Sequence, residues 1–147
     1  MNEIYNRTEM LIGTENVEKL KKKHVMIFGI GGVGSYAAEA VARAGIGEIT
    51  VVDKDTVSLS NINRQLIALH STIGMAKVEV MKQRIFDINP DISVNAIEQF
   101  CLPENIDMFF EKSVDYVIDA VDTVSAKLAI IEKCKSENIG IISAMGA

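Results

Sequence analysis

The chain has 147 residues, the length of one ordinary domain, and 48% of them are apolar, so its composition excludes a disordered chain and allows a sizeable core. The formal net charge of −5 argues against a large basic face that would wrap nucleic acid within this stretch. Two cysteines without a CxxC pair exclude a disulfide framework. Together with a polar N-terminus and no apolar run of membrane-spanning length, they lead us to expect a cytoplasmic protein with no membrane partner.

Strand and helix patterns alternate along the chain. Short apolar runs predict strands over residues 24–30, 48–53, 92–97, 114–120 and 139–144. Helical spacing and stop signals predict helices over residues 3–22 with a break near Gly13, 34–45, 75–89, 103–111 and 125–138. This alternation predicts an α/β fold, a Rossmann-like doubly wound and mostly parallel sheet with helices on both faces.

Some residues outside the motifs carry simpler expectations. His24 is expected at the surface or at a strand edge rather than as a ligand, and Cys101 and Cys134 as small buried apolar residues. The sequence ends "GIISAMGA", a strand pattern followed by Gly146. A strand that ends in a glycine turn is typical of a chain that continues, so we expect the first part of a longer protein.

A glycine-rich turn follows the first predicted strand in "VMIFGIGGVGSYAAEA". Gly29, Gly31, Gly32 and Gly34 lie where a strand passes into a helix, and glycines there permit a tight bend and let backbone N–H groups approach a phosphate. The N-terminus of the next helix favours the anion. Asp53 ends the second strand, about 20 residues past the last glycine, where a carboxylate binds ribose hydroxyls. In this context the motif predicts an adenine-nucleotide site.

The kind of nucleotide is decided by charge. The spacing of Gly29 and Gly34 also matches a P-loop, but Ser35 and Tyr36 stand where that loop requires Lys and Ser or Thr, so a P-loop NTPase is rejected. NAD and ATP remain. NAD carries only a pyrophosphate, whereas the triphosphate of ATP needs fixed cations and usually Mg²⁺.

Three charged residues favour ATP. Arg64 stands 11 residues after Asp53, and Lys77 lies in the first turn of the helix predicted over residues 75–89, where a cation is disfavoured unless an anion lies there. Asp122 follows the fourth strand at the carboxyl edge of the sheet, where a carboxylate can hold Mg²⁺. Taken singly, Arg64 and Lys77 are also compatible with surface charges. Asp119 or Asp122 could cap the following helix, and Asn61 could be a turn residue.

Several stretches together resemble one family: "GIGGVGS", "GIGEITVVDKDTVSLSNINRQ", "GMAKVEVM", "INP" and "VIDAVDTVSAK". From Arg7 onward the chain is similar to the HesA/MoeB/ThiF family of ubiquitin-activating-enzyme-like adenylating enzymes. Within that family, "AAEAVARAGIGEIT", the N-x-N-R-Q pattern and "IDAVDTVSAK" resemble the tRNA-modifying branch that dehydrates threonylcarbamoyladenosine.

The resemblance implies a role for each matching position. Contacts to the nucleotide are implied for Gly29, Gly31, Gly32, Gly34, Asp53, Asp55, Arg64, Gln65, Lys77 and Asp122. Catalytic roles are implied for Asn61, Arg64, Lys77 and Arg7. Arg64 would stabilise the charge that develops at the α-phosphate, Lys77 would hold phosphate oxygens, and Asp122 would hold Mg²⁺. Arg7 would reach across a homodimer into the other copy's site, or else be an ordinary exposed arginine.

The activity that the resemblance implies is ATP-dependent adenylation of a carboxylate, with Mg²⁺. In the tRNA-modifying branch, the carboxylate belongs to threonylcarbamoyladenosine at tRNA position 37, which closes to a cyclic form with net loss of water. In other branches, it is the C-terminal carboxylate of a ubiquitin-like sulfur-carrier protein, and the adenylating residues cannot distinguish the two. A non-catalytic scaffold and an NAD-dependent oxidoreductase are the weaker interpretations.

The resemblance also bears on domain organisation, because the family has a second half that these residues lack. We expect residues 1–147 to be an ATP-binding adenylation domain, the N-terminal portion of a longer protein, and do not expect it to complete the reaction alone.

Overall fold

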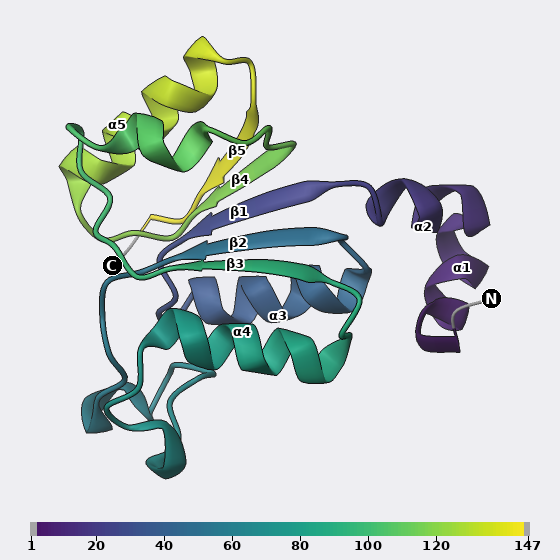
Figure 1. Cartoon of the computed structure of the whole chain (residues 1–147), viewed down its shortest axis with the longest axis horizontal. Helices are drawn as coiled ribbons and strands as arrows, with labels where there is room; N and C mark the ends of the chain where they lie inside the picture. Colours follow the sequence, from purple (N-terminus) through teal and green to yellow (C-terminus); the bar gives the residue numbers. More distant parts are fainter. Residues whose placement is uncertain (1–2, 146–147) are drawn as a thin grey trace.

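A five-stranded sheet forms the centre of the computed structural model, which describes residues 3–145 (Figure 1). The strands are β1 (His24–Phe28), β2 (Glu48–Val52), β3 (Ser93–Ile97), β4 (Tyr116–Asp119) and β5 (Gly140–Ser143). They lie in the order β3-β2-β1-β4-β5, and every pairing is parallel. The chain builds one side of the sheet from β1 to β3 and then crosses to β4, so the order reverses beside β1. Ligands of open α/β sheets bind at such a switch point.

Helices cover both faces of the sheet. Figure 1 shows α3 (Gly34–Ala44) and α4 (Lys77–Ile88) on one face and α5 (Val124–Ser136) on the other. Before β1 come α1 (Asn6–Ile12) and α2 (Thr14–Leu20), separated by Gly13 with a φ of +82°. Short 3-10 turns complete the described elements: η1 (Glu3–Tyr5), η2 (Leu59–Asn61), η3 (His70–Thr72) and η4 (Ile106–Phe110). The predicted α/β fold is confirmed.

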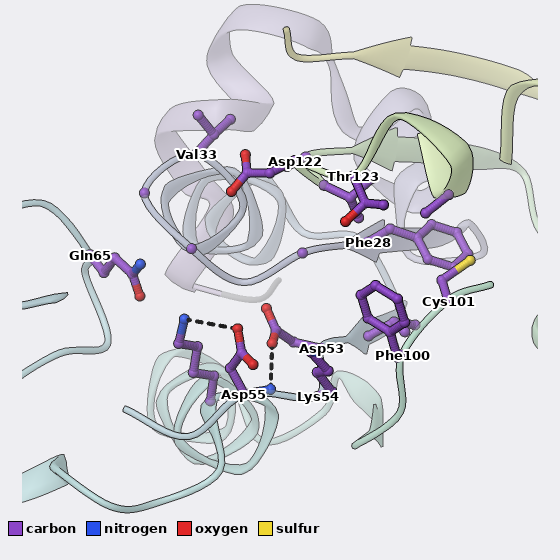
Figure 2. Close-up of a pocket in the computed structure, with 18 of the residues that line it drawn as sticks. Phe28, Val33, Asp53, Lys54, Asp55, Gln65, Phe100, Cys101, Asp122 and Thr123 are labelled. Carbon is purple, nitrogen blue, oxygen red and sulfur yellow. Dashed lines mark hydrogen bonds and ion pairs between the residues drawn. The ribbon is translucent and has the colours of Figure 1, made fainter. Parts of the chain in front are cut away.

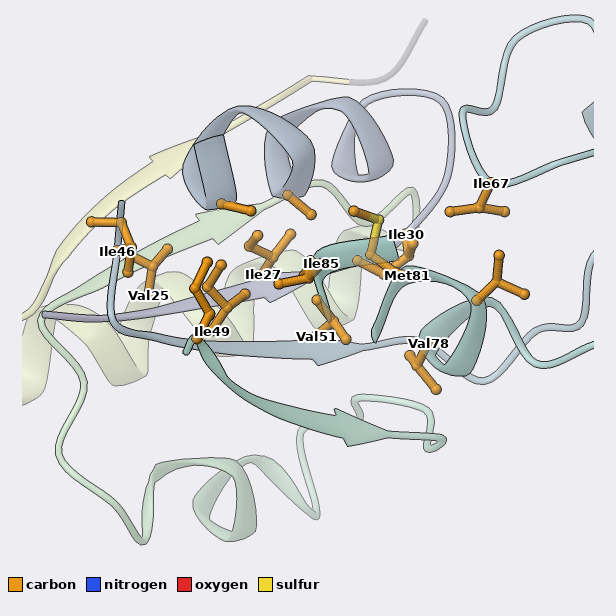
Figure 3. Close-up of a cluster of buried hydrophobic side chains, with 14 of the residues drawn as sticks. Val25, Ile27, Ile30, Ile46, Ile49, Val51, Ile67, Val78, Met81 and Ile85 are labelled. Carbon is orange, nitrogen blue, oxygen red and sulfur yellow. The ribbon is translucent and has the colours of Figure 1, made fainter. Parts of the chain in front are cut away.

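Side chains of the central strand alternate between the two faces, because successive strand residues point to opposite sides. Val25 and Ile27 belong to a buried cluster with residues of α3 and α4 (Figure 3). Met26 and Phe28 belong to a second cluster with residues of α5 and η4. A strand that packs on both sides must be largely apolar, which explains why β1 is buried throughout and follows a continuous apolar pattern from Val25 to Phe28.

The helix predicted over residues 103–111 is wrong in type and in its start. The structure has only the 3-10 turn η4, and Asn105 explains the delay. Its Oδ1 accepts a hydrogen bond from the Leu102 N–H at 2.7 Å, and its Nδ2 donates to the Phe100 carbonyl at 2.8 Å. These bonds fold the chain back before a helix can begin.

The expectation that His24 lies at the surface or at a strand edge is also wrong. His24 is buried at the start of β1, which has a neighbour on each side. Its Nδ1 lies 2.7 Å from the Ser113 carbonyl oxygen and its Nε2 lies 2.7 Å from Thr50 Oγ1. Both ring nitrogens therefore have hydrogen-bond partners, which allows the ring to be buried.

Two further expectations concern the ends and surfaces of the chain. Gly146, which was expected to turn the chain after β5, lies outside the described residues. Within residues 3–145, none of the helices combines the length and the apolar character that crossing a bilayer requires.

Candidate nucleotide-binding site

A pocket of about 700 Å³ opens at the carboxyl ends of the strands (Figure 2). Its walls come from the loops that follow β1, β2, β3 and β4, together with the start of α4. The residues predicted from sequence that line it are Gly29, Gly31, Gly32, Asp53, Asp55, Arg64, Gln65, Lys77 and Asp122. Segments far apart in the sequence therefore meet at the switch point of the sheet, where a ligand is expected.

The glycines of the turn have two different tasks. Gly31 and Gly32 line the pocket, and a Cβ there would meet only ordinary contacts, at 3.5 Å from the side chains of Gln65 and Arg64. A Cβ on Gly34 would lie 1.5 Å from the Gly29 carbonyl oxygen, so this glycine lets α3 start directly beneath the turn. Gly29 has a φ of +88° and packs against the backbone after β4.

Ser35 holds the glycine turn against the loop that carries Arg64. Its hydroxyl donates to the Gly31 carbonyl at 2.5 Å and accepts from the Leu66 N–H at 3.2 Å. The side chain is fully buried, so both bonds are shielded from water. Sequence reasoning used Ser35 only to reject a P-loop and missed this role, although a small hydroxyl residue at a helix start was its signal.

Asp53 ties the same turn to the loop after β2. One carboxylate oxygen accepts the Ile30 N–H at 2.7 Å and the other accepts the Asp55 N–H at 2.8 Å, which Figure 2 marks with a dashed line. A carboxylate has about four acceptor sites, so these two bonds leave room for hydroxyl donors from a ligand. The carboxylate is thus fixed in the position predicted to face a ribose.

In the part of the chain that the structure describes, three cations line the pocket, and two of them, Arg64 and Lys77, were predicted from the sequence. Lys77 is only 6% exposed, and its Nζ lies 4.0 Å from an oxygen of Asp55, beyond hydrogen-bonding distance. Arg64 is exposed, and its Nη1 donates to the Ser60 carbonyl at 3.1 Å and to Asn63 Oδ1 at 2.9 Å. The stem of Lys77 is buried, while its ammonium lies on the pocket lining without a close counter-ion among the described residues, so Lys77 is placed to bind an anion that enters the pocket.

Gln65 carries a second unsatisfied group. The side chain is 7% exposed, and within residues 3–145 its Oε1 is buried without a hydrogen-bond partner. Buried acceptors are normally paired, so a donor from a ligand or from water completes this site. Among the described residues, the pocket therefore contains two groups without close partners, the ammonium of Lys77 and the amide oxygen of Gln65.

Besides Gly34, which packs beneath the glycine turn, two predicted residues lie outside the pocket lining. Asn61 is buried next to it, where its Oδ1 accepts the Ser58 N–H at 2.9 Å and closes the η2 turn. Arg7 is exposed on α1, which lies at the amino end of the sheet, opposite the pocket (Figure 1). Within one chain, Asn61 shapes the loop before Arg64, and Arg7 is remote from the site.

The loop between β4 and α5 supplies an exposed carboxylate. Asp122 lines the pocket, and in residues 3–145 no group of three His, Cys, Asp or Glu side chains forms a ready-made metal site. Mg²⁺ usually binds one or two carboxylates together with substrate phosphates. Asp122 alone therefore fits a Mg²⁺ ion that also binds a triphosphate.

Behind this loop lies a buried ion pair that sequence reasoning missed. Lys127 Nζ lies 2.7 Å from Asp119 Oδ2 and 2.9 Å from the Ala144 carbonyl oxygen. The other oxygen of Asp119 accepts the Val121 N–H at 3.1 Å. Asp119 was considered as a helix cap, but its carboxylate instead joins β4, α5 and the residue after β5.

The loop after β3 forms a wall of the pocket that no motif indicated. It contributes Gln99, Phe100 and Cys101, and Lys54 lies against the ring of Phe100. Burial raises the pKa of the Cys101 thiol to about 11, with a further contribution from the charge of Asp119. The thiol is therefore protonated at neutral pH and is not a nucleophile.

Cys134 behaves in the same way, since burial is again the main cause of a pKa of about 11. The expectation that both cysteines are small buried residues is confirmed.

A glycine turn after β1 and a carboxylate at the end of β2 are the arrangement typical of a Rossmann-like α/β domain. The chain belongs to the ThiF family, whose model matches residues 5–147. This confirms the family that the motifs resemble.

Relatives support this assignment at the level of both sequence and structure. A tRNA threonylcarbamoyladenosine dehydratase of Bacillus subtilis is 50% identical over 143 residues, 97% of this chain and 56% of the relative. A molybdopterin-synthase adenylyltransferase of Haemophilus influenzae is 35% identical over 145 residues, 95% of this chain and 58% of the relative. The crystal structure of the Escherichia coli dehydratase in complex with ATP superposes with a TM-score of 0.96 at 41% identity, covering 99% of this chain and 60% of that one. The chain thus spans about half the length of the curated relatives it matches.

Proposed function

We propose that this chain is the ATP-binding part of an enzyme that adenylates a carboxylate. The observation that carries the proposal is Lys77, whose buried stem holds an ammonium in the same pocket as the glycine turn and Arg64, without a close counter-ion in the described part of the chain. A pyrophosphate needs no such concentration of cations, whereas a triphosphate does. The similarity to a dehydratase crystallised with ATP supports ATP over NAD.

In the proposed reaction, an oxygen of the substrate carboxylate attacks the α-phosphate of ATP and pyrophosphate leaves, which gives an acyl-adenylate. Arg64 and Lys77 neutralise the charge that develops on the phosphate oxygens, and Asp53 orients the ribose. Asp122 holds Mg²⁺, which neutralises further phosphate charge when it is bound. Asn61 supports the loop that presents Arg64.

The substrate that we propose is threonylcarbamoyladenosine at tRNA position 37, which the completed enzyme converts to its cyclic form. Three bacterial dehydratases of this name are 42–50% identical to the chain over at least 90% of its length, and a dehydratase 2 of Saccharomyces cerevisiae is 33% identical. The adenylyltransferases are 33–36% identical. The net charge of −5 leaves little basic surface for tRNA in this chain. We assign tRNA binding to further sequence of a longer protein, of which residues 1–147 are the N-terminal portion.

A second candidate substrate is the C-terminal carboxylate of a ubiquitin-like sulfur carrier. It is favoured by the adenylyltransferase relatives and by the acidic character of the chain. Analysis of tRNA nucleosides by mass spectrometry, in cells lacking the gene, separates the two: loss of the cyclic nucleoside supports the tRNA substrate, and an unchanged level supports the carrier.

We further propose a homodimer in which Arg7 acts on the other copy's nucleotide. The helix that carries Arg7 lies at the opposite end of the sheet from the pocket of its own chain, so only a second copy can bring the two together (Figure 1).

The adenylation itself is tested by exchange of labelled pyrophosphate into ATP in the longer protein, with substrate tRNA present. Arg64→Ala and Lys77→Ala are expected to lower the exchange rate about 100- to 1,000-fold, the usual effect of losing a group that stabilises transition-state charge. Lys82→Ala, on the exposed side of α4, is the matched control and should retain the rate. Wild-type exchange rates in the Arg64 and Lys77 variants, or tight binding of NAD without ATP, would refute the proposal.

A further inference from the structure

An ammonium group and an aromatic ring meet at the edge of the pocket, outside the glycine and N-x-N-R-Q motifs. Lys54 Nζ lies 4.3 Å from the centre of the Phe100 ring, within the range of a cation–π interaction. Both residues line the pocket (Figure 2). Lys54 follows β2 and Phe100 follows β3, so the contact joins two loops that are far apart in the sequence.

The Phe100 ring is not what holds its own loop in place. The loop is fixed by Asn105, which bonds the Phe100 carbonyl at 2.8 Å and the Leu102 N–H at 2.7 Å. The next residue, Cys101, is buried in the apolar cluster beneath the pocket, whereas the Phe100 side chain is only partly buried. The ring is therefore available to a ligand, while backbone bonds and Cys101 anchor the loop.

The order of the strand ends gives the direction in which a nucleotide lies, and this step rests on the proposed function. Phosphates are assigned to the glycine turn after β1, and the ribose to Asp53 after β2. Continuing in the same direction along the edge of the sheet, the next loop is the one after β3, which carries Phe100. The base then extends from the ribose towards the ring of Phe100.

We propose that Phe100, together with Lys54, binds the base of the nucleotide. An aromatic ring stacks on the π-face that every base has, and stacking is therefore tolerant of base identity. The Lys54 ammonium rests against the ring and places positive charge beside ring nitrogens of the base that accept hydrogen bonds. A purine covers more of the ring than a pyrimidine does, so the pair favours ATP over CTP.

Calorimetric titration of the 147-residue chain with ATP, CTP and inorganic tripolyphosphate, all with Mg²⁺, separates binding of the base from binding of the phosphates. Phe100→Ala is expected to weaken ATP binding about 5- to 150-fold, the usual range for losing one stacked base. Binding of tripolyphosphate, which has no base, should not change. Phe100→Tyr keeps an aromatic face and should retain the affinity for ATP.

The lysine is tested separately, since its part is smaller. Lys54→Met keeps a long apolar side chain but removes the charge, and it should weaken ATP binding about 2- to 5-fold, as expected for a partly exposed cation–π contact. Phe86→Ala and Lys82→Met remove an exposed ring and an exposed ammonium from α4, away from the pocket, and serve as matched controls.

The outcomes distinguish this inference from the proposed function. If the wild-type chain binds neither ATP nor tripolyphosphate, both fail. If it binds ATP and Phe100→Ala binds ATP equally well, the proposed function survives and the role of Phe100 is refuted. An equal loss for ATP and tripolyphosphate, with a lower unfolding temperature, would show that the ring only supports the loop.

Discussion

Two buried lysines in neighbouring regions of the molecule differ in what neutralises them. Lys127 in α5 is 9% exposed, and its Nζ has a carboxylate oxygen at 2.7 Å and a carbonyl oxygen at 2.9 Å. Lys77 at the start of α4 is 6% exposed, and its salt-bridge partner Asp55 is 4.0 Å away and itself largely exposed. One ammonium is satisfied by the fold, and the other is not.

This difference suggests that the charge of Lys127 stabilises the fold, whereas the charge of Lys77 is available to bind a ligand. Removing an ion from water costs several kcal/mol unless close partners replace the water. Around Lys127, Asp119 and the Ala144 carbonyl replace the water that the ammonium loses on burial. Within the described residues, the region around Lys77 supplies no close counter-ion and places the ammonium at a helix N-terminus, where a cation is disfavoured in the absence of an anion. A triphosphate would reverse both penalties.

The comparison predicts that replacing Lys127 has the largest effect on the free energy of unfolding. Lys127→Met leaves the fully buried carboxylate of Asp119 without its counter-ion, so the free energy of unfolding should fall by about 3–5 kcal/mol in urea titrations. The double variant Lys127→Met, Asp119→Leu removes both charges and should recover most of the loss. A loss below about 1 kcal/mol in the single variant would mean that the pair contributes little and that the two lysines are alike.

Replacing Lys77 should have the opposite effect on stability from replacing Lys127. Lys77→Met removes a poorly paired ammonium from a buried position and keeps its apolar stem, so the free energy of unfolding should rise by about 1 kcal/mol. The same variant should lose most of the rise in unfolding temperature that ATP gives the wild type, because ligand stabilisation follows affinity. A less stable variant that still responds fully to ATP would contradict the assignment of Lys77 to a ligand.

The part of the site built on β1 and β2 could be predicted from the sequence, because its signals are local. The turn glycines and Asp53 stand at fixed distances from strand patterns, and the structure places Gly31, Gly32 and Asp53 around one pocket. The fold could also be predicted from local signals, because apolar strands that alternate with helices are compatible with few other arrangements. Gly34 was predicted to contact the nucleotide, but in the structure it allows α3 to pack closely against the turn, and a sequence pattern does not show that contact.

In the loop after β4, Asp122 was predicted from the sequence and lines the pocket, but the contacts of the loop after β3 and of α5 could not be predicted in the same way. Phe100 and Lys54 are in contact because the loops after β2 and β3 fold together at the edge of the sheet, and no sequence spacing predicts that contact. Lys127 occupies a helix position at which lysine is usually exposed, so its buried partner was invisible in one sequence. The partners of His24 were equally hidden, since Thr50 and Ser113 come from other segments of the chain.

The smallest effect tests whether Asp55 really is a weak partner of Lys77. The Asp55 side chain is 57% exposed, so the contact at 4.0 Å should be worth less than about 1 kcal/mol, and Asp55→Asn should change the free energy of unfolding by no more than that. Removing this negative charge beside the ammonium should instead tighten tripolyphosphate binding about 2- to 5-fold at low salt. Asp87→Asn, on the exposed side of α4, is the control for a general change in net charge. A loss of more than about 2 kcal/mol in Asp55→Asn would make Asp55 a structural counter-ion. In that case the Lys77 charge would already be neutralised by the fold, as the Lys127 charge is, and the case for a triphosphate in the pocket would lose its main support.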